Sequence, residues 1–283
     1  SNPVQHLTFE GFYRAGAGSS IIDKGAMHRY RTERKPVDDF TNQIIKMSDQ
    51  YLAETSPNPK VARCVLNWLS HWAEGNAFLG NMSHQGRFVR KWELGTISLA
   101  YLKIRNEENL QSAKKNLVKK WIKKWADDVY EDYSSRLNLN SRNNNHAYWA
   151  SWSVGLAGVV LNNRKFFDWM VERHYEAMQK IEEDGTLPLE MARRSKALHY
   201  HVYSAQALVM VAELAAQNGI ELFDIEGGAL HRLINRIIAG LSKPYYFEEK
   251  TGKTQSWVGK PQGGKFAWME AYNKRYPNEK IKK

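Results

Sequence analysis

The sequence predicts an all-α protein, and three observations lead to this fold class. Apolar residues recur at three- and four-residue steps, the strict alternation typical of strands is nearly absent, and short breaks rich in Pro, Gly, Asn and Asp separate the periodic segments. Hydrophobic residues make up 42% of the 283 residues and aromatic residues 12%, which is enough apolar material to bury a core. We therefore expect one helical domain over residues 1–283.

Two stretches of the chain are predicted to be irregular. The first forty residues contain the Gly-rich run 15–20, and residues 243–264 contain several Gly and Pro residues. Such compositions favour turns and mobile loops. Either stretch could cover a cleft. The alternative is that the first forty residues are a flexible terminus and that residues 243–264 are a surface loop.

Between these stretches the apolar spacing predicts successive amphipathic helices. The first covers 38–55, and the run Pro57-Asn58-Pro59 ends it. The next two follow the apolar positions of 61–72 and 88–101. Five more are expected over 109–133, 145–161, 164–182, 192–217 and 228–241. The loops between them are short, so sequential helices are expected to be antiparallel neighbours.

The formal net charge of +11 predicts a surface that attracts polyanions. Charge alone does not distinguish nucleic acid from an acidic polysaccharide. The basic residues are dispersed, and no zinc-finger, RNA-recognition or basic-zipper pattern occurs, so nucleic acid is not expected as a partner.

Other features exclude further classes of protein. Cys64 is the only cysteine, so no intramolecular disulfide can form, and its apolar neighbours predict a buried thiol. No apolar run approaches the ~20 residues of a membrane span, and no membrane partner is expected. No signal peptide is recognisable before Ser1, which favours a mature or trimmed chain.

The most informative segment is the run Asn143-Asn144-Asn145-His146-Ala147-Tyr148-Trp149. It opens the helix predicted over 145–161, and donors at a helix N-terminus favour a bound anion. Helical spacing places Asn145, Tyr148 and Trp149 on one stripe with His146 beside it. The aromatic faces of this stripe are expected to stack on a sugar ring.

A second segment, Arg193 to His201, follows about fifty residues later. Arg193 and Tyr200 are expected about 10 Å apart along a helix axis at ~1.5 Å per residue. Arg194 is interpreted as structural. The residues expected to share the face of this helix are Arg193, Lys196, Tyr200 and Tyr203.

The two segments resemble the N-N-H-x-Y-W and R-R-x-x-A-L-x-Y-H motifs of the family-5 polysaccharide lyases, the alginate (mannuronate) lyases. Weaker matches spread the resemblance over nearly the whole chain: R-K-W-x-L-G at 90–95, L-F-D-W at 166–169, G-F-L-P-N-E at 185–190 and K-F-S-W at 265–268. The resemblance implies a single-domain α/α toroid, an incomplete barrel, with a mobile N-terminal lid within about 1–37.

It also implies β-elimination on a β-1,4-linked uronate polymer. Removal of the C5 proton places further negative charge beside an existing carboxylate, so this proton is only weakly acidic. The charge of the carboxylate therefore has to be neutralised first. We expect Arg193 and Asn145 to neutralise it, His146 to act as base and Tyr200 as acid, with Tyr200 in both roles as the alternative. Nearby cations are expected to lower the pKa of the tyrosine.

Further residues are predicted to bind the substrate. Arg14 precedes Gly18-Ser19-Ser20, where relatives carry a lysine before G-S-D, and His199 stands where relatives carry a small residue. The extra imidazole of His199 could make binding pH-dependent or alter the choice of sugar. The predicted substrate-binding set is Arg14, Arg90, Lys91, Tyr148, Trp149, Lys196, His199 and Tyr203.

The resulting hypothesis is a metal-independent lyase without a cofactor. Poly-mannuronate is the favoured substrate, with glucuronan and hyaluronan next, and the alternative is a non-catalytic protein that binds acidic polysaccharide. Hydrolysis of the polymer is less favoured, because it would need a pair of carboxylates flanking the scissile bond, and the two motifs supply Asn, His, Arg and Tyr instead. No metal is expected, because His199 and His201 lie on different helix faces. Relatives suggest a periplasmic or secreted location, and we expect a monomer.

Overall fold

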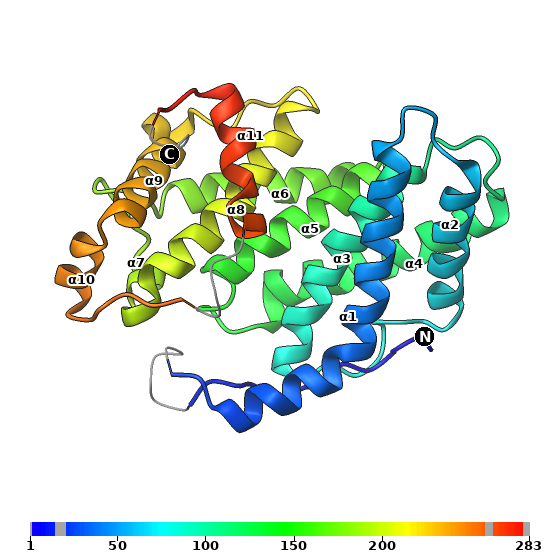
Figure 1. Ribbon diagram of the computed structural model, residues 1–283, viewed down its shortest axis with the longest axis horizontal. Helices are drawn as coiled ribbons and strands as arrows, with labels where there is room; N and C mark the ends of the chain where they lie inside the picture. Colours follow the sequence, from blue (N-terminus) through cyan, green and yellow to red (C-terminus); the bar gives the residue numbers. More distant parts are fainter. Residues whose placement is uncertain (1, 15–20, 258–262, 280–283) are drawn as a thin grey trace. The chain divides into compact units, whose positions relative to one another are not determined.

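A computed structural model describes residues 2–14, 21–257 and 263–279. Over these ranges the chain forms eleven α-helices and no β-sheet (Figure 1). Two isolated bridges, Leu7 with Met82 and Tyr13 with Ile22, are the extended pairings of the described part. The prediction of an all-α fold is confirmed.

The chain divides into two compact units. Unit 1 comprises 1–12, 23–136 and 153–167, and unit 2 comprises 13–22, 137–152 and 168–283. Helices α5 (Asn145–Leu161) and α6 (Arg164–Met178) contribute residues to both units. The expectation of one domain stays a prediction.

Unit 1 contains helices α1 (Lys24–Ala53), α2 (Pro59–Glu74), α3 (His84–Ile104) and α4 (Ser112–Glu131), followed by a π-helical turn, Asp132–Arg136. Helix α1 packs on α3, and α2 packs on α4. Aromatic rings pack against each other in the core: those of Phe40 and Trp72 are stacked with centroids 3.6 Å apart, and those of Phe78 and Trp125 are tilted with centroids 4.5 Å apart. Such pairs contribute stability beyond the area that they bury.

Helix α1 begins fourteen residues earlier than the 38–55 predicted. The side chain of Asp23 accepts a hydrogen bond of 2.8 Å from the backbone nitrogen of Ala26 and caps the helix. The buried positions in its first half are sparse, with Tyr30 followed only by Val37 and Phe40. Exposed charged residues fill the intervening turns and hide the apolar period from the sequence.

Unit 2 is built around α8 (Ala197–Ala216), which is buried over most of its length. It packs against α7 (Pro188–Met191), α9 (Ile225–Ser242), α10 (Tyr245–Thr251) and α11 (Ala267–Arg275). Helix α10 lies inside the stretch 243–264 that was predicted to be irregular, and that prediction is wrong there. Residues 226–228 have positive φ angles of 50°, 62° and 74°, so the regular part of α9 begins at Ala229, close to its predicted start.

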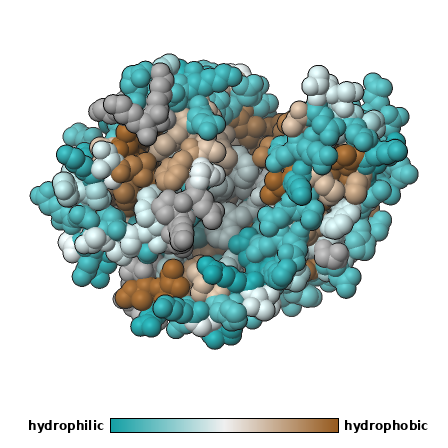
Figure 2. All heavy atoms as spheres, in the orientation of Figure 1, coloured by the Kyte–Doolittle hydropathy of each residue, from teal (hydrophilic) through white to brown (hydrophobic). Residues whose placement is uncertain are grey.

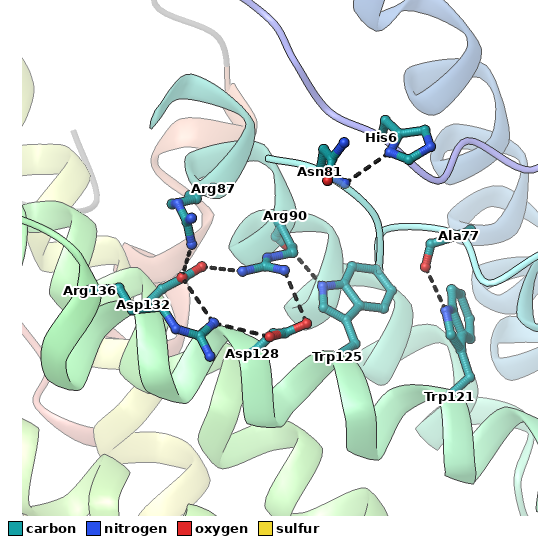
Figure 3. A network of polar contacts seen from close by, with 10 residues as sticks. All are labelled: His6, Ala77, Asn81, Arg87, Arg90, Trp121, Trp125, Asp128, Asp132 and Arg136. Carbon is teal, nitrogen blue, oxygen red and sulfur yellow. Dashed lines mark hydrogen bonds and ion pairs between the residues drawn. The ribbon is translucent and has the colours of Figure 1, made fainter. Parts of the chain in front are cut away.

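Arg90 and Lys91 lie inside unit 1. Arg90 is 3% exposed and ion-pairs with Asp132, which is fully buried, and with Asp128 at 3.2 Å (Figure 3). Lys91 is fully buried, with its Nζ 3.9 Å from the centroid of the Trp92 ring, and burial lowers its pKa well below the usual range. Side chains with this burial give no support to the predicted contacts with substrate carboxylates.

Asp132 joins three arginines, and its charge is expected to stabilise unit 1. It ion-pairs with Arg87 and Arg90 and lies 3.7 Å from Arg136. Substitution Asp132→Asn keeps the size of the side chain and removes the charge, so we expect the free energy of unfolding to fall by about 2 kcal/mol. Urea unfolding measures this change. The exposed substitution Asp39→Asn serves as control, and an equal loss in both variants would contradict a special role for Asp132.

Hydrophilic residues cover most of the face drawn in Figure 2. Among the described helices, none is both long enough and apolar enough to cross a membrane. The thiol of Cys64 on α2 is only half-buried, so the prediction of a buried thiol is wrong.

Candidate active site

The two sequence motifs meet at one pocket of unit 2. The pocket has a volume of about 520 Å³, and both motifs contribute to its wall. The lining residues are Leu139, Asn140, Asn143, Asn144, Leu189, Ala192 and Arg193. A helix start and a guanidinium at one wall favour an anionic ligand.

Asn145 is the first residue of α5 and is fully buried. Its backbone nitrogen donates to Oε1 of Glu190 at 2.7 Å, and its Nδ2 lies 3.1 and 3.0 Å from the two carboxylate oxygens of Glu190. Because a carboxylate only accepts hydrogen bonds, these contacts fix the orientation of the Asn145 amide. The side-chain Oδ1 of Asn145 has no hydrogen-bond partner among the described residues.

Glu190 is a functional candidate that the sequence analysis did not select. It is 1% exposed, and burial raises the pKa of its carboxyl, while the N–H groups of Asn145 and the charge of Arg193 act in the opposite direction. The segment Gly185–Glu190 resembled a family motif, but a lone Glu after a Pro has no chemical signature of its own. Its partner lies 45 positions earlier in the chain, so only the fold reveals the contact.

The guanidinium of Arg193 lies over the ring of Tyr200, and the two residues do not lie on one continuous helix, where about 10 Å along the axis was expected. Its Cζ is 3.7 Å from the centroid of the Tyr200 ring, a short cation–π contact. The helix predicted from 192 begins only at Ala197, because Arg194 has a left-handed backbone with φ of 54°. The prediction of a continuous helical face from Arg193 through Lys196 to Tyr200 is therefore wrong, although the pairing of Arg193 with Tyr200 is present.

A segment sixty residues downstream holds this turn. The side-chain oxygen of Gln255 accepts a hydrogen bond of 3.0 Å from the backbone nitrogen of Leu198, and its Nε2 donates to the carbonyl of Arg194 at 3.1 Å. The backbone nitrogen of Ser256 donates to the carbonyl of Ser195 at 2.7 Å. Gln255 thus supplies the cap that the start of α8 lacks in its own sequence.

Lys196 is engaged within unit 2. It is 8% exposed, its Nζ donates to the carbonyl of Trp257 at 2.7 Å, and burial lowers its pKa. This contact with the protein occupies one of its three donors. The predicted binding of substrate by Lys196 stays a prediction.

Tyr200 keeps its proton at neutral pH. Burial raises its pKa well above the usual range; Arg193 acts to lower it, and Tyr13 and Glu190 act to raise it. The expected lowering by cations is present but is outweighed by burial. A protonated phenol suits a general acid, so the structure favours Tyr200 as acid over Tyr200 as base in the unbound protein.

Tyr13 is a second residue that the sequence analysis did not select. Its hydroxyl lies 2.6 Å from the hydroxyl of Tyr200, and the Arg193 Cζ lies 5.6 Å from its ring centroid. The neighbouring Arg14 is exposed, and its backbone nitrogen donates to the carbonyl of Ile21 at 3.0 Å. The Gly-rich run 15–20, the centre of the predicted lid, lies outside the described residues. The feature of the sequence that could have identified Tyr13 as a site residue is its position beside this Gly-rich run.

His146 is half-buried in the first turn of α5. Its backbone nitrogen donates to the side-chain Oδ1 of Asn144 at 2.9 Å. Asn144 lines the pocket, so this bond ties the backbone of His146 to the pocket wall. The position is compatible with the predicted role as base, which stays a prediction.

Tyr148 and Trp149 pack inside unit 2. Tyr148 is 4% and Trp149 is 9% exposed. The Trp149 indole donates to the carbonyl of Tyr203 at 3.1 Å and stacks on the Tyr203 ring with centroids 4.9 Å apart. Burial raises the pKa of Tyr148. The aromatic stripe predicted to stack on a sugar ring therefore forms part of the core instead of an open platform, while Tyr203 is half-buried.

His199 is a neutral imidazole over the usual range of pH. Burial, reinforced by Lys265 and by Lys196 and Arg193, lowers its pKa to about 3. Its ring lies parallel to that of Tyr203 with centroids 6.5 Å apart. The suggested pH-dependent binding through His199 is therefore not supported, whereas a role in the choice of sugar stays a prediction.

Metal ligands do not cluster in the described part of the chain, where no group of three His, Cys, Asp or Glu side chains is placed to hold an ion. His201 is engaged otherwise: its Nδ1 lies 2.8 Å from the carbonyl of Ala197, and its Nε2 accepts a bond of 2.9 Å from the backbone nitrogen of Leu187. This bond ties α8 to the start of α7.

We expect the protein to lose stability as the pH falls from about 6.5 to about 4. Burial lowers the pKa of His201 and of His174, each fully buried, to about 4. The unfolded chain binds these protons below about pH 6.5, whereas the folded chain does not. The contribution of these neutral rings to the free energy of unfolding is thus complete above about pH 6.5. For each histidine, roughly 2–3 kcal/mol of it is lost by pH 4. Urea unfolding at pH 7, 6, 5 and 4 measures this loss. A flat profile in this window would contradict neutral burial of the two rings.

Comparisons with known proteins agree with this fold. The family described as "Alginate lyase" matches residues 13–247. An alginate lyase of Cobetia marina is 34% identical over 278 residues, which covers 96% of this chain and 72% of that protein.

Solved structures are similar over almost the whole chain. Alginate lyase A1-III from Sphingomonas species A1 has 26% sequence identity and a TM-score of 0.86, covering 99% of this chain and 79% of that one. A Tyr-to-Phe variant of alginate lyase A1-III, complexed with a tetrasaccharide, has 25% identity and a TM-score of 0.84, covering 98% of this chain and 78% of that one. The fold class implied by the resemblance is confirmed.

Proposed function

Since this chain belongs to the alginate lyase family, we propose that it cleaves the poly-mannuronate of alginate by β-elimination. The observation that carries the assignment of the site is the guanidinium of Arg193, which lies at the pocket wall and 3.7 Å from the ring centroid of Tyr200. The guanidinium can neutralise a carboxylate of the substrate, and the phenol of Tyr200 holds a proton that it can donate.

The first step is neutralisation of the uronate carboxylate. The Arg193 guanidinium offers parallel N–H donors to its two oxygens. The amide nitrogen of Asn145 carries two hydrogens, and one of them can be shared between the two oxygens of the Glu190 carboxylate, so that the other is the donor for the substrate. The reduced negative charge beside C5 makes loss of its proton less costly.

The second step moves two protons. The imidazole of His146 takes the C5 proton, the electron pair forms the C4–C5 double bond, and the bond from C4 to the glycosidic oxygen breaks. The leaving oxygen takes the phenolic proton of Tyr200. The resulting phenolate lies under the Arg193 guanidinium, which stabilises its charge. Proton transfer back from His146, through water, restores both groups.

The proposal is tested with defined polymers. Incubation with poly-mannuronate is expected to raise the ultraviolet absorbance of the unsaturated product, and poly-guluronate, glucuronan and hyaluronan serve as comparisons. The raised pKa of Tyr200 supports the division of roles, with His146 as the base. Substitution His146→Gln should then lower the turnover by about 10²–10⁴-fold, the usual contribution of a positioned general base. Absence of a signal with every polyuronate would overturn the lyase assignment.

We further propose that the protein acts as a monomer in the periplasm or outside the cell. The nature of the substrate, a polymer too large to enter a cell intact, supports the proposed location. Fractionation of the source cells and sedimentation of the purified protein test the two statements separately.

A further inference from the structure

Helix α4 carries six lysines within eleven residues, as the pairs 114–115, 119–120 and 123–124. The opposite side of the helix is buried, through Val118, Trp121 and Trp125 among others. Trp121 and Trp125 also donate to the carbonyls of Ala77 and Arg90 at 2.8 and 3.0 Å, which fixes the rotation of the helix (Figure 3). Lys119, Lys120 and Lys124 are consequently exposed.

These charges are poorly compensated. Within the part of the chain that the structure describes, no carboxylate forms an ion pair with Lys119, Lys120 or Lys124, whereas Lys123 pairs with Asp127 at 2.6 Å. Like charges one turn apart on a helix repel each other. None of these lysines is among the buried residues through which α4 packs, so their charges have no evident part in its packing.

The start of α6 extends the positive surface. The Nζ of Lys123 lies 5.3 Å from the ring centroid of Phe166, and the Nζ of Lys165 lies 4.2 Å from that of Tyr130 on α4. Lys165 is exposed. We name the group Lys119, Lys120, Lys123, Lys124 and Lys165 the α4 basic surface. It belongs entirely to unit 1, whereas the candidate active site belongs to unit 2.

We infer that the α4 basic surface is an accessory binding site for the acidic polysaccharide, which holds a second stretch of the polymer; this rests on the proposed function. A uronate polymer carries a carboxylate on every sugar. Lysine ammonium groups are flexible point charges that attract such a chain in any register, whereas arginine would favour bidentate pairing at fixed positions. Holding one stretch of a polymer raises its effective concentration for the rest of the protein.

Other polyanions fit this surface less well. The apolar face of α4 is buried within unit 1, so the helix has no apolar side to insert into a lipid surface. Single-stranded nucleic acid needs open aromatic rings for base stacking, and the aromatic rings beside these lysines, Phe166 and Tyr130, are buried and half-buried.

The test compares two variants with the same change in charge. The first is Lys119→Gln, Lys120→Gln, Lys124→Gln, and the matched control is Lys46→Gln, Lys243→Gln, Lys274→Gln, which alters three exposed lysines elsewhere. Both are made in the full chain and in a Tyr200→Phe background, so that binding is measured without cleavage. Long poly-mannuronate and a tetrasaccharide are the ligands.

For the first variant we expect the dissociation constant for the long polymer to rise about fivefold to tenfold, with a weaker dependence on salt. Affinity for the tetrasaccharide and its turnover stay unchanged, and the control alters neither. An equal loss in the control, an equal loss for the tetrasaccharide, or a larger loss for anionic vesicles or single-stranded DNA than for the polymer would overturn the inference. Failure of the proposed function is distinguishable, because it appears as absent turnover in the parent chain, whereas polymer binding is read independently.

Discussion

Replacing Tyr200 by phenylalanine is expected to lower the turnover of poly-mannuronate by about 10²–10⁴-fold, the usual contribution of a positioned general acid. The phenylalanine ring retains the contact with the Arg193 guanidinium, which lies 3.7 Å from the ring centroid. It loses the hydroxyl, and with it the bond of 2.6 Å to the hydroxyl of Tyr13. Binding should therefore change by less than about tenfold, since only one hydrogen bond is removed. Initial rates and equilibrium binding measure the two effects.

The matched control is Tyr175→Phe, on α6, whose side chain is 41% exposed. It should leave both rate and affinity unchanged. Turnover of the Tyr200→Phe variant within a factor of about ten of the parent would remove Tyr200 from the chemical step. A parent protein that binds the polymer and never cleaves it would instead identify a non-catalytic polysaccharide-binding protein.

Replacing Glu190 by alanine is expected to lower both activity and stability. The carboxylate accepts three contacts of 2.7–3.1 Å from Asn145, and the substitution leaves the buried N–H groups of that residue without their acceptor. The cost is about 3 kcal/mol in the free energy of unfolding. The Asn145 amide also loses its fixed orientation, so kcat should fall by about 10–100-fold, as for other residues that orient a catalytic group. Urea unfolding and initial rates measure these changes.

Two further substitutions separate orientation from folding. Glu190→Gln retains an acceptor for the backbone N–H of Asn145 and should recover most of the stability but only part of kcat. Glu183→Ala, at an exposed position of the same unit, should alter neither quantity. If Glu190→Gln matched the parent in kcat, the negative charge of Glu190 would have no part in holding the amide.

The sequence predicts most of the helices, because buried faces impose their period on the residues. Helix α5 runs from Asn145 to Leu161, as predicted, since its apolar spacing is dense. The first half of α1 was missed because few of its positions are buried. The break before α8 was missed because Arg194 adopts a left-handed backbone that hydrogen bonds from distant residues hold, and no local signal marks it.

The candidate site was predictable as a set of residue types and not as a geometry. The motifs placed Arg193 and Tyr200 together, but their contact arises from a turn and not from one helical face. Glu190 and Tyr13 join the site through pairings across 45 and 187 positions, which local patterns do not contain. For Arg90 the sequence predicted a substrate contact, whereas the structure shows a buried ion pair with Asp132, a partner 42 positions away that no local pattern reveals.

The side chain of Gln255 holds the backbone turn that follows Arg193, since it bridges Arg194 and Leu198. The motif from Arg193 to His201 is consequently not a portable module. Grafted alone onto another helical scaffold, it would be free to wind into the regular helix that its spacing favours, and the arginine would swing away from the phenol. Transfer of this motif to another protein therefore has to include Gln255, or another residue that makes the same two hydrogen bonds.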